Sequence, residues 1–328
     1  MKITLAHGSG GKSTSELIEN IFAKHFSNPL LNKMEDSTVL PNIDGKIAVT
    51  TDSFVVSPLF FKGGDIGKLC VCGTVNDLLM SGAVPKYLTC GFIIETGTEL
   101  DVLDKIAYSM AECAKSAGVL IVAGDTKVIE GNGGVYINTT GIGAIPNDRD
   151  ISIFNCDIGD AVIVSGTLGD HHATILSNRM NIENDIESDC AVLGELVNTL
   201  LDNGIRVKAM RDVTRGGLAT ILNEISVASK AGIEIYESQI PVSLQVKGLC
   251  GVLGLDPLYM GNEGKLVVVV DKADKDKALQ FLTSTDLGKN AKIIGEVKGG
   301  EAKLLLKTSI GGLRIVGVLQ GEGLPRIC

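Results

Sequence analysis

Five aspartates stand within or beside otherwise apolar segments of the sequence. A carboxylate in such a setting costs free energy unless it is paired with a cation or bound to a metal. Oxygen ligands of this kind suit Mg²⁺ that is shared with the phosphates of a nucleotide. Taken singly, each aspartate fits a helix cap or a turn, but five together favour a site for a cation and phosphates. They are Asp36, Asp52, Asp77, Asp125 and Asp212.

A glycine-rich stretch near the start of the chain could bind those phosphates. Residues 6–13 read Ala-His-Gly-Ser-Gly-Gly-Lys-Ser, one glycine short of the P-loop pattern. Glycines that lead into a helix let backbone N–H groups and the helix dipole hold phosphates, with Lys12 adding positive charge. A true P-loop and a plain turn that caps the helix both stay open as interpretations. Against the P-loop, the expected preceding strand starts at residue 3 and leaves little chain to embed it in a parallel sheet.

A third candidate is Glu263, in the segment 259–265 just before an expected strand. A carboxylate at the mouth of a strand can act as a general base if its surroundings raise its pKa. The segment alone also fits a solvated turn. The neighbouring histidines His171 and His172 favour a loop or a substrate contact, because two adjacent histidines rarely ligate one metal well.

The fourth candidate is Cys328, the last residue of the sequence. A thiol at the end of an arm with upstream glycines and Pro325 could be carried into another protein's active site and back into its own. An accidental cysteine at a frayed end is the alternative. The other seven cysteines include no C-x-x-C pair, so we expect small core residues with free thiols in a reducing cytoplasm.

Composition limits the classes of function. The chain has 328 residues, a net charge of −9 and no tryptophan, so it lacks both the basic surface and the stacking platforms of a nucleic-acid-binding protein. Its length suggests about two domains, and no apolar run approaches the ~18 residues that a membrane span needs. Glycine is in excess, with 40 residues, which indicates tight turns, close backbone approaches to a ligand, or both.

Hydrophobic periodicity predicts the elements that must position these residues. The expected helices are 13–26, 65–81, 100–117, 195–203, 218–231 and 274–283. The expected strands are 3–6, 38–40, 46–51, 86–94, 119–123, 134–145, 161–165, 265–270 and 292–297. The last two strands and the helix between them are typical of a crossover unit. Strands and helices are mixed on both sides of a polar break at 147–150, which predicts two α/β or α+β domains.

The sequence resembles the HypE family of carbamoyl dehydratases, which act in hydrogenase maturation. More broadly, it is similar to the superfamily of aminoimidazole ribonucleotide synthetase and selenophosphate synthetase. The terminal Pro-Arg-Ile-Cys, together with Gly-Asp-Ile-Gly-Lys-Leu and Gly-Thr-Val-Asn-Asp-Leu, is a highly specific combination. The matching stretches span the whole chain and are 7–11, 51–56, 63–85, 124–127, 138–143, 210–219, 262–267 and 325–328.

The resemblance implies a reaction and a set of residues. A carbamoyltransferase, HypF, would load a carbamoyl group onto Cys328, and this chain would use ATP and Mg²⁺ to dehydrate it to an S-cyanide for the iron of [NiFe] hydrogenase. Glu263 would be the base, assisted by Lys127. The implied magnesium-side residues are Asp36, Asp52, Asp77 and Asp212. The implied nucleotide-binding residues are His7, Gly8, Gly10, Gly11, Lys12, Asn76, Asp77, Asp125 and Thr126.

The resemblance also implies an architecture and partners. The expected fold has an N-terminal ATP-binding domain at 1–148 that pairs into a dimeric β-barrel, a C-terminal α/β domain at 149–316, and a mobile tail at 317–328. The cyanide would pass to a scaffold of HypC and HypD. Two alternatives stay open, a small-molecule synthetase of the same superfamily (selenophosphate or purine type) and a P-loop ATPase.

Overall fold

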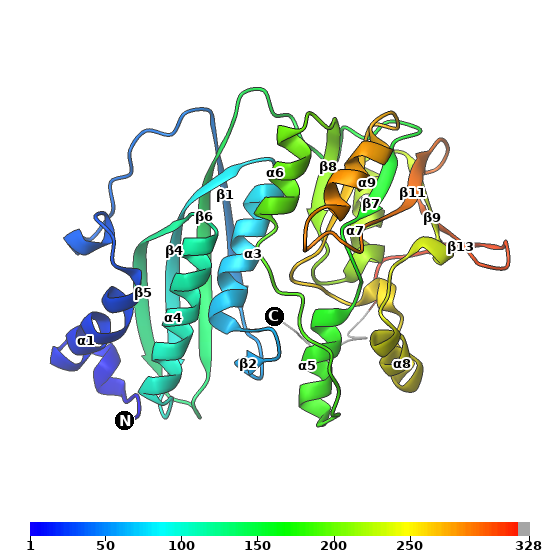
Figure 1. The fold of residues 1–328 in the computed structure, drawn as a ribbon. Coiled ribbons are helices and arrows are strands. Elements are labelled where there is room, and N and C mark those ends of the chain that lie inside the picture. The colour runs from blue at the N-terminus through cyan, green and yellow to red at the C-terminus, as the bar shows by residue number, and fades with distance from the viewer. Residues whose placement is uncertain (321–328) are drawn as a thin grey trace.

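A computed structural model describes residues 1–320, so the thiol of Cys328 lies outside the described residues. The first half of the chain forms a four-stranded sheet in the order β1-β6-β4-β5 (Figure 1). The pairings are antiparallel except for β4 with β5, which run parallel. The strands are β1 (Lys46–Phe54), β4 (Val84–Glu95), β5 (Leu120–Ile129) and β6 (Val135–Ile145). A small hairpin, β2 (Phe60–Phe61) and β3 (Gly64–Asp65), precedes the first long helix.

Two helices, α3 (Ile66–Met80) and α4 (Leu100–Ser116), lie side by side across one face of this sheet (Figure 1). The carboxylate of Asp65 caps α3 by accepting from the backbone N–H groups of Gly67 at 2.7 Å and Lys68 at 3.2 Å. Helix α3 is apolar on nearly all sides because it is enclosed by the sheet, by α4 and by the second half of the chain. By contrast, α4 is amphipathic and buries only one face.

The N-terminal segment differs from the expectation. The predicted strand at 3–6 is wrong, since Lys2 makes only an isolated bridge and Leu5–Gly8 forms a 3-10 turn (η1). The expected helix at 13–26 is confirmed as a continuous run through α1 (Lys12–Leu17), the π-helical η2 (Ile18–Ala23) and α2 (Lys24–Phe26). It packs Phe22 on Phe92 of β4, with ring centroids 4.6 Å apart. A short turn, η3 (Leu31–Lys33), follows, and the strand expected at 38–40 does not form.

The second half of the chain forms a seven-stranded sheet in the order β13-β12-β9-β11-β7-β10-β8. Its strands are β7 (Ala161–Val164), β8 (Val207–Asp212), β9 (Gly232–Tyr236), β10 (Leu266–Val270), β11 (Lys292–Lys298), β12 (Leu304–Lys307) and β13 (Leu313–Val316). Its helices are α5 (Asp170–Met180), α6 (Gly194–Asp202), α7 (Gly217–Ser229), α8 (Leu244–Leu253) and α9 (Lys275–Thr283), with the short turns η4 (Glu237–Gln239) and η5 (Pro257–Tyr259). The expected crossover forms with β7 inserted between its two strands, because β10 and β11 both pair antiparallel with β7.

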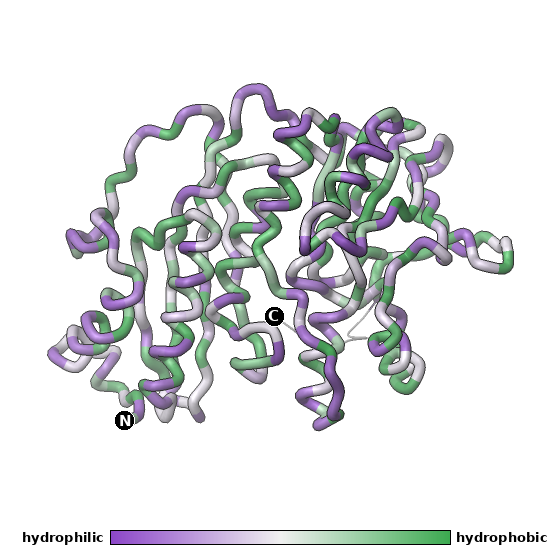
Figure 2. Tube along the Cα trace, viewed as in Figure 1, coloured by the Kyte–Doolittle hydropathy of each residue, from purple (hydrophilic) through white to green (hydrophobic). Residues whose placement is uncertain are grey.

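Apolar residues concentrate along α3 and the central strands of the second sheet (Figure 2). One core cluster joins both halves, because side chains of α3 and α6 and the inner faces of β8 and β10 belong to it together. Within residues 1–320, no helix is both long and apolar enough to cross a membrane.

Candidate active site

A cavity of about 380 Å³ lies between the N-terminal helical segment and strands β4 and β5. Phe22, Phe26 and Phe92 form part of an apolar inner wall, while glycines and charged side chains stand around the rest. An apolar wall beside polar groups suits a flat heteroaromatic ring that carries charged phosphates. The candidates from the sequence that line this cavity are Gly8, Gly10, Asp36, Asp125, Thr126 and Lys127.

Gly8 allows the N-terminal segment to lie directly against β5. A methyl group at this position would come within 2.8 Å of the Cβ of Val128 and 2.9 Å of its backbone nitrogen. Gly10 has a φ of +81°, which favours glycine, and its N–H donates to the Thr14 hydroxyl at 3.0 Å. These glycines therefore shape one side of the cavity.

The other glycine-loop candidates, His7, Gly11 and Lys12, are not among the residues that line the cavity. The Nδ1 of His7 lies 3.1 Å from the backbone nitrogen of Thr4, and Gly11 caps the helix. Lys12 forms an exposed ion pair with Glu16 at 3.6 Å. No sheet strand precedes this loop among the described residues, so the setting of a P-loop is absent there.

A charged pair stands at the cavity on β5. Asp125 lies within this strand, not after it as expected, and its carboxylate binds the ammonium group of Lys127 at 2.8 Å. The hydrogen bond from Lys127 is the main cause that holds the pKa of Asp125 below its usual value. Both side chains are exposed, so phosphates could reach this ammonium group from solvent.

Three of the four expected magnesium-side carboxylates come together at a second place, between the two halves of the chain. Asp52 lies within β1, again not after the strand as expected, while Asp77 lies on α3 and Asp212 ends β8. The hydroxyl of Thr50 donates to Asp77 at 2.7 Å. Asp36 lines the nucleotide-sized cavity instead, at the opposite edge of the first sheet.

Negative charge is concentrated in this carboxylate cluster. Burial raises the pKa of Asp52 to about 6, aided by the charge of Asp77 and a hydrogen bond with it. Burial and then the charge of Asp77 raise the pKa of Asp212 to about 7. Such shifts mean that the ionised carboxylates lack enough compensating positive charge.

Glu263 belongs to the same cluster and is buried, so the solvated turn is excluded. Burial raises the pKa of Glu263 well above its usual value, and the nearby charges of Asp212 and Asp189 add to the shift. Its backbone N–H donates to Asp189 at 3.1 Å, and Asp189 forms a buried ion pair with Lys265 at 3.2 Å. Residues 188–193 therefore form a strap that covers Glu263.

Asn76 connects α3 to this strap. Its side-chain amide donates to the Ala191 carbonyl at 3.0 Å, and its side-chain oxygen accepts from the Leu193 N–H at 2.9 Å. Both the amide nitrogen and the amide oxygen of the Asn76 side chain are thus hydrogen-bonded to the backbone of this chain. The expected nucleotide contact stays a prediction.

Sequence reasoning missed two residues that act on Glu263. Arg215 is exposed, and its positive charge lowers the pKa of both Asp52 and Glu263, partly offsetting the effect of burial. Its place in Asp-Val-Thr-Arg-Gly-Gly, directly before α7, was a usable signal. Asp189 carried no signal, because its partners Glu263 and Lys265 are distant in the sequence.

The two adjacent histidines are not in a loop, which corrects the expectation. Both lie in the first turn of α5 and are buried. The Nδ1 of His171 lies 2.7 Å from the hydroxyl of Ser188 in the strap. Burial lowers the pKa of His172 to about 4, so its ring is neutral at physiological pH.

The carboxylate cluster fits a cation that arrives with phosphates. In the described part of the chain, no three His, Cys, Asp or Glu side chains are arranged to hold a metal ion by themselves. Mg²⁺ usually takes only one or two protein carboxylates and fills its other positions with water and phosphate oxygens. The raised pKa values of Asp52 and Asp212 mark the charge that such a cation would balance.

Comparisons with known proteins show the family to which the chain belongs. Two family models match the chain, the N-terminal domain of AIR synthase related protein at 34–145 and its C-terminal domain at 157–307. Carbamoyl dehydratase HypE of Rhodobacter capsulatus is 46% identical over 335 residues, with 100% of this chain and 98% of the relative covered. The chain belongs to the HypE family. HypE of Escherichia coli K12 is 45% identical, with 99% of each chain covered.

Solved HypE structures extend the match to three dimensions. A HypE crystal structure in complex with ATP aligns with a TM-score of 0.95 at 43% identity, covering 99% of each chain. A HypE–HypF complex aligns at 0.81 and 48% identity, covering 92% of this chain and 99% of the other. Thiamine monophosphate kinase of Aquifex aeolicus, at 19% identity and a TM-score of 0.64, shares the fold. The expected family, two-domain fold class and enzyme class are therefore confirmed.

Proposed function

We propose that this chain uses ATP to dehydrate a carbamoyl group carried on the thiol of Cys328 to an S-cyanide. The cyanide would supply the iron of [NiFe] hydrogenase. The observation that carries the proposal is the burial of Glu263 beside Asp212 and Asp52 in a chain of the HypE family. This burial supports a role for Glu263 as a base of high proton affinity beside carboxylates that would hold a phosphate-bound cation.

The chemistry explains why both ATP and a base are needed. Loss of water from an amide requires its oxygen to become a leaving group, so the γ-phosphate of ATP is transferred to the carbamoyl oxygen. Phosphate then leaves with that oxygen, and both N–H protons are removed as the C≡N bond forms. The net products are the S-cyanide, ADP and phosphate.

We assign the proton transfer to Glu263. A carboxylate whose conjugate acid has a raised pKa accepts a proton more readily than a solvated one. Asp189 of the strap, itself paired with Lys265, fixes the backbone of Glu263, and the burial of Glu263 keeps bulk water away from its side chain. Lys127 would assist by neutralising negative charge on the transferred phosphate.

Nucleotide binding divides between the two places. The apolar cavity at β5 would hold the adenine ring, with Gly8, Gly10 and Thr126 at its side. Asp52, Asp77 and Asp212 would hold Mg²⁺, which supplies positive charge to the phosphates when bound. The crystal structure of a HypE relative with ATP supports nucleotide binding by this fold.

We also propose a homodimer formed through the open face of the first sheet. Helices α3 and α4 cover the other face, while Val49 is 65% exposed, Ile47 62% and Ile93 45% on the open side. Apolar side chains this exposed on neighbouring strands indicate a partner surface. The cavity at β5 and Asp52 on β1 lie three strands apart, or roughly 14 Å, so a second copy could bring them together.

The partner proteins follow from the same proposal. HypF would load the carbamoyl group, which the solved HypE–HypF complex of a relative supports. A HypC–HypD scaffold would receive the cyanide. We retain 1–148, 149–316 and 317–328 as the proposed divisions of the chain into nucleotide domain, second domain and tail.

The test is intact-mass spectrometry after incubation with HypF, carbamoyl phosphate and ATP. We expect the tail peptide first to gain the mass of a carbamoyl group and then to lose the mass of water. Cys328→Ala should bind ATP but gain neither group. A tail peptide that stays carbamoylated in the presence of ATP and Mg²⁺ would refute the dehydratase proposal, and turnover of a free small substrate without partners would indicate a synthetase.

A further inference from the structure

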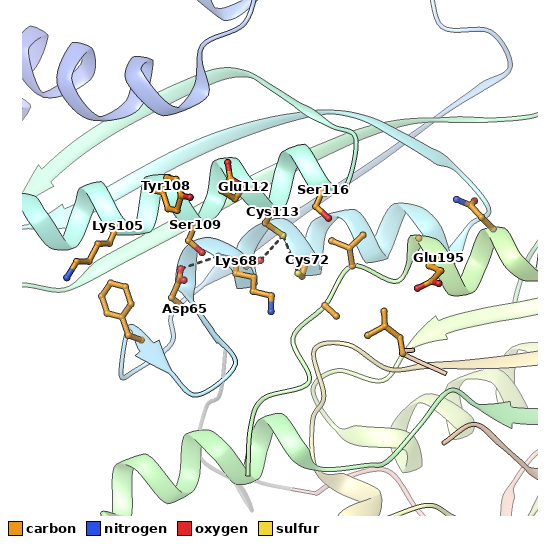
Figure 3. A pocket seen from close by; sticks show the side chains of 17 residues that line it. Asp65, Lys68, Cys72, Lys105, Tyr108, Ser109, Glu112, Cys113, Ser116 and Glu195 are labelled. Atoms are coloured by element: carbon orange, nitrogen blue, oxygen red, sulfur yellow. Dashed lines mark hydrogen bonds between the residues drawn. The ribbon is translucent and has the colours of Figure 1, made fainter. Parts of the chain in front are cut away.

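A large cavity of about 900 Å³ lies along α3, α4 and the start of α6, and Ala191 and Val192 of the strap also line it. Its lining carries both signs of charge, with Lys68 and Lys105 on one hand and Asp65, Glu112 and Glu195 on the other (Figure 3). Two cysteines, Cys72 and Cys113, also line it. The proposed function uses none of these side chains.

The two thiols are in direct contact. Cys72 on α3 and Cys113 on α4 have their Sγ atoms 3.6 Å apart, and one of the dashed lines in Figure 3 joins these two labelled side chains. A disulfide bond is about 2.05 Å long, so the sulfur atoms need to approach by about 1.5 Å. Cys72 is fully buried, whereas Cys113 is partly exposed. A reagent in the cavity would therefore reach Cys113 first.

The surroundings favour the thiolate of Cys113. The hydrogen bond from Cys72 is the main cause that lowers the pKa of Cys113, and the positive charge of Lys68 lowers it further, while burial and Asp65 oppose the shift. The ammonium group of Lys68 is held by the carbonyl of Gly63 at 2.9 Å. Cys72 shows the opposite shift, since its hydrogen bond to Cys113 raises its pKa.

We propose that Cys72 and Cys113 form a redox-active dithiol that reacts with small peptide disulfides entering this cavity. Such a disulfide carries ammonium and carboxylate groups together, which matches the mixed charges of Lys68, Lys105 and Glu112 on the walls. The cavity is at the upper end of the ~300–1,000 Å³ range of ligand pockets and has room for such a molecule. This inference does not depend on the proposed function.

The reaction has two balanced steps. The Cys113 thiolate attacks one sulfur of the small disulfide, so a mixed disulfide forms, the S–S bond of the reagent breaks and the first small thiolate departs. Cys72 then attacks the Sγ of Cys113 and displaces the second small thiolate, which takes up the proton of Cys72. The reagent is reduced to two thiols, and the protein dithiol is oxidised to an intramolecular disulfide.

The new bond would tie α3 to α4. Cys72 is five residues before Asp77 on α3, so oxidation would act on the helix that carries part of the carboxylate cluster. Cys190 of the strap also hydrogen-bonds Cys72. A bond between Cys72 and Cys190 is therefore a distinguishable alternative.

The test treats the full chain, in a Cys328→Ala background, with oxidised glutathione. We expect loss of two hydrogens, with non-reducing peptide mapping that shows the Cys72 and Cys113 peptides joined. Cys72→Ala should instead accumulate one glutathionyl group on Cys113, at least about tenfold faster than any other cysteine is modified. Cys113→Ala should form neither product, while the control Cys156→Ala, which removes a buried thiol elsewhere, should react like its parent.

Two results would overturn the proposal. One is a Cys113 that is modified no faster than Cys156 in the parent protein. The other is a mapped disulfide between Cys72 and Cys190. The mapping of the parent protein requires no substitution in the helices, so misfolding of a variant does not affect it.

Discussion

At the scale of single residues, the carboxylate cluster lowers the stability of the free protein but favours the binding of a cation. Asp212 and Glu263 are buried without enough positive charge around them, so each ionised group costs free energy in the folded chain. A bound cation would remove much of that cost. The cluster therefore stores binding energy for a phosphate-bound cation at the expense of the stability of the free protein.

Asp212→Asn tests this directly. The pKa of Asp212 is raised from 3.8 to about 7, so between these values the folded chain binds more protons than the unfolded chain, and its stability falls as pH rises. We expect the substitution to raise the free energy of unfolding at pH 8 by about 2–4 kcal/mol, and the gain to disappear near pH 4. Urea unfolding at several pH values measures this.

The control for this prediction is Asp148→Asn, an exposed loop carboxylate. We expect it to change the free energy of unfolding by less than about 0.5 kcal/mol at any of these pH values. A stability gain for Asp212→Asn that is as large at pH 4 as at pH 8 would contradict the electrostatic explanation.

Glu263→Gln tests whether this side chain removes the N–H protons of the carbamoyl group. The amide keeps the size of the side chain but cannot accept a proton, so we expect the tail to remain at the carbamoyl stage, with the S-cyanide formed at least about 100-fold more slowly. Mass spectrometry of the tail peptide follows both species. Conversion at the wild-type rate would exclude Glu263 as the base, while leaving the dehydration of Cys328 itself intact.

At the scale of elements, helix α3 connects the two halves of the chain at the carboxylate cluster. It packs on the first sheet, on α4 and on β8, and it carries Asp77. Asn76 joins it through two hydrogen bonds to the strap that covers Glu263. A substitution at Asn76 should therefore lower the stability of the folded chain more than it lowers the affinity for the nucleotide.

Asn76→Ala should lower the free energy of unfolding by about 2–4 kcal/mol. The substitution leaves the buried Leu193 N–H and the partly buried Ala191 carbonyl without their partner, and each such group costs about 1–3 kcal/mol. Asn198→Ala on the exposed face of α6 is the matched control, with little expected change. A large loss of ATP affinity without loss of stability would instead assign Asn76 to the nucleotide.

Gly8→Ala should weaken ATP binding by about tenfold, or about 1.4 kcal/mol. The added methyl group would collide with the backbone of Val128 and push the N-terminal segment away from β5, which widens the cavity. Isothermal titration calorimetry measures the affinity. Gly248→Ala on α8, where the methyl group meets no atom within 4 Å, should leave it unchanged. An unaltered affinity for Gly8→Ala would place the nucleotide elsewhere.

Elements with a strong local pattern were predictable from the sequence. The helix expected at 65–81 forms as α3, because Asp65 caps it and apolar residues continue along it. Helix α5 gave no signal, since its first half buries His171 and Thr174, whose hydrogen bonds with Ser188 and the Ile186 carbonyl depend on the fold. Strand β8 was missed because Lys208 and Arg211 interrupt its apolar residues.

The residue types of the site were predictable from the sequence, but which of these residues lie close together in the fold was not. Aspartates in apolar segments indicated a cation site, and three of them converge. Asp36 does not, because the strand order of the first sheet separates it from Asp52, and no local pattern encodes strand order. The burial of Glu263 was equally hidden, since Asp189 and the strap reach it only in the folded chain.

At the scale of the whole molecule, a single copy places its two candidate centres at opposite edges of one sheet. The cavity with Lys127 adjoins β5, and Asp52 with Asp212 adjoins β1 and the second half of the chain. Packing of two open sheet faces against each other would bring the β5 edge of one copy toward the β1 edge of its partner. Each complete site would then use Lys127 from one copy and Asp212 from the other.

Heterodimers of two variants test whether Lys127 and Asp212 of one site come from different copies of the chain. Lys127→Ala and Asp212→Asn should each be inactive alone, but a heterodimer of the two, purified through different tags, should recover about half of the wild-type rate, because one of its two sites is intact. A heterodimer of Asp52→Asn with Asp212→Asn is the matched control. These two residues belong to one cluster in the same chain, so neither site is intact and no activity should return. If the first pair stays as inactive as the control, each chain holds Lys127 and Asp212 at one site of its own, and the shared arrangement is wrong.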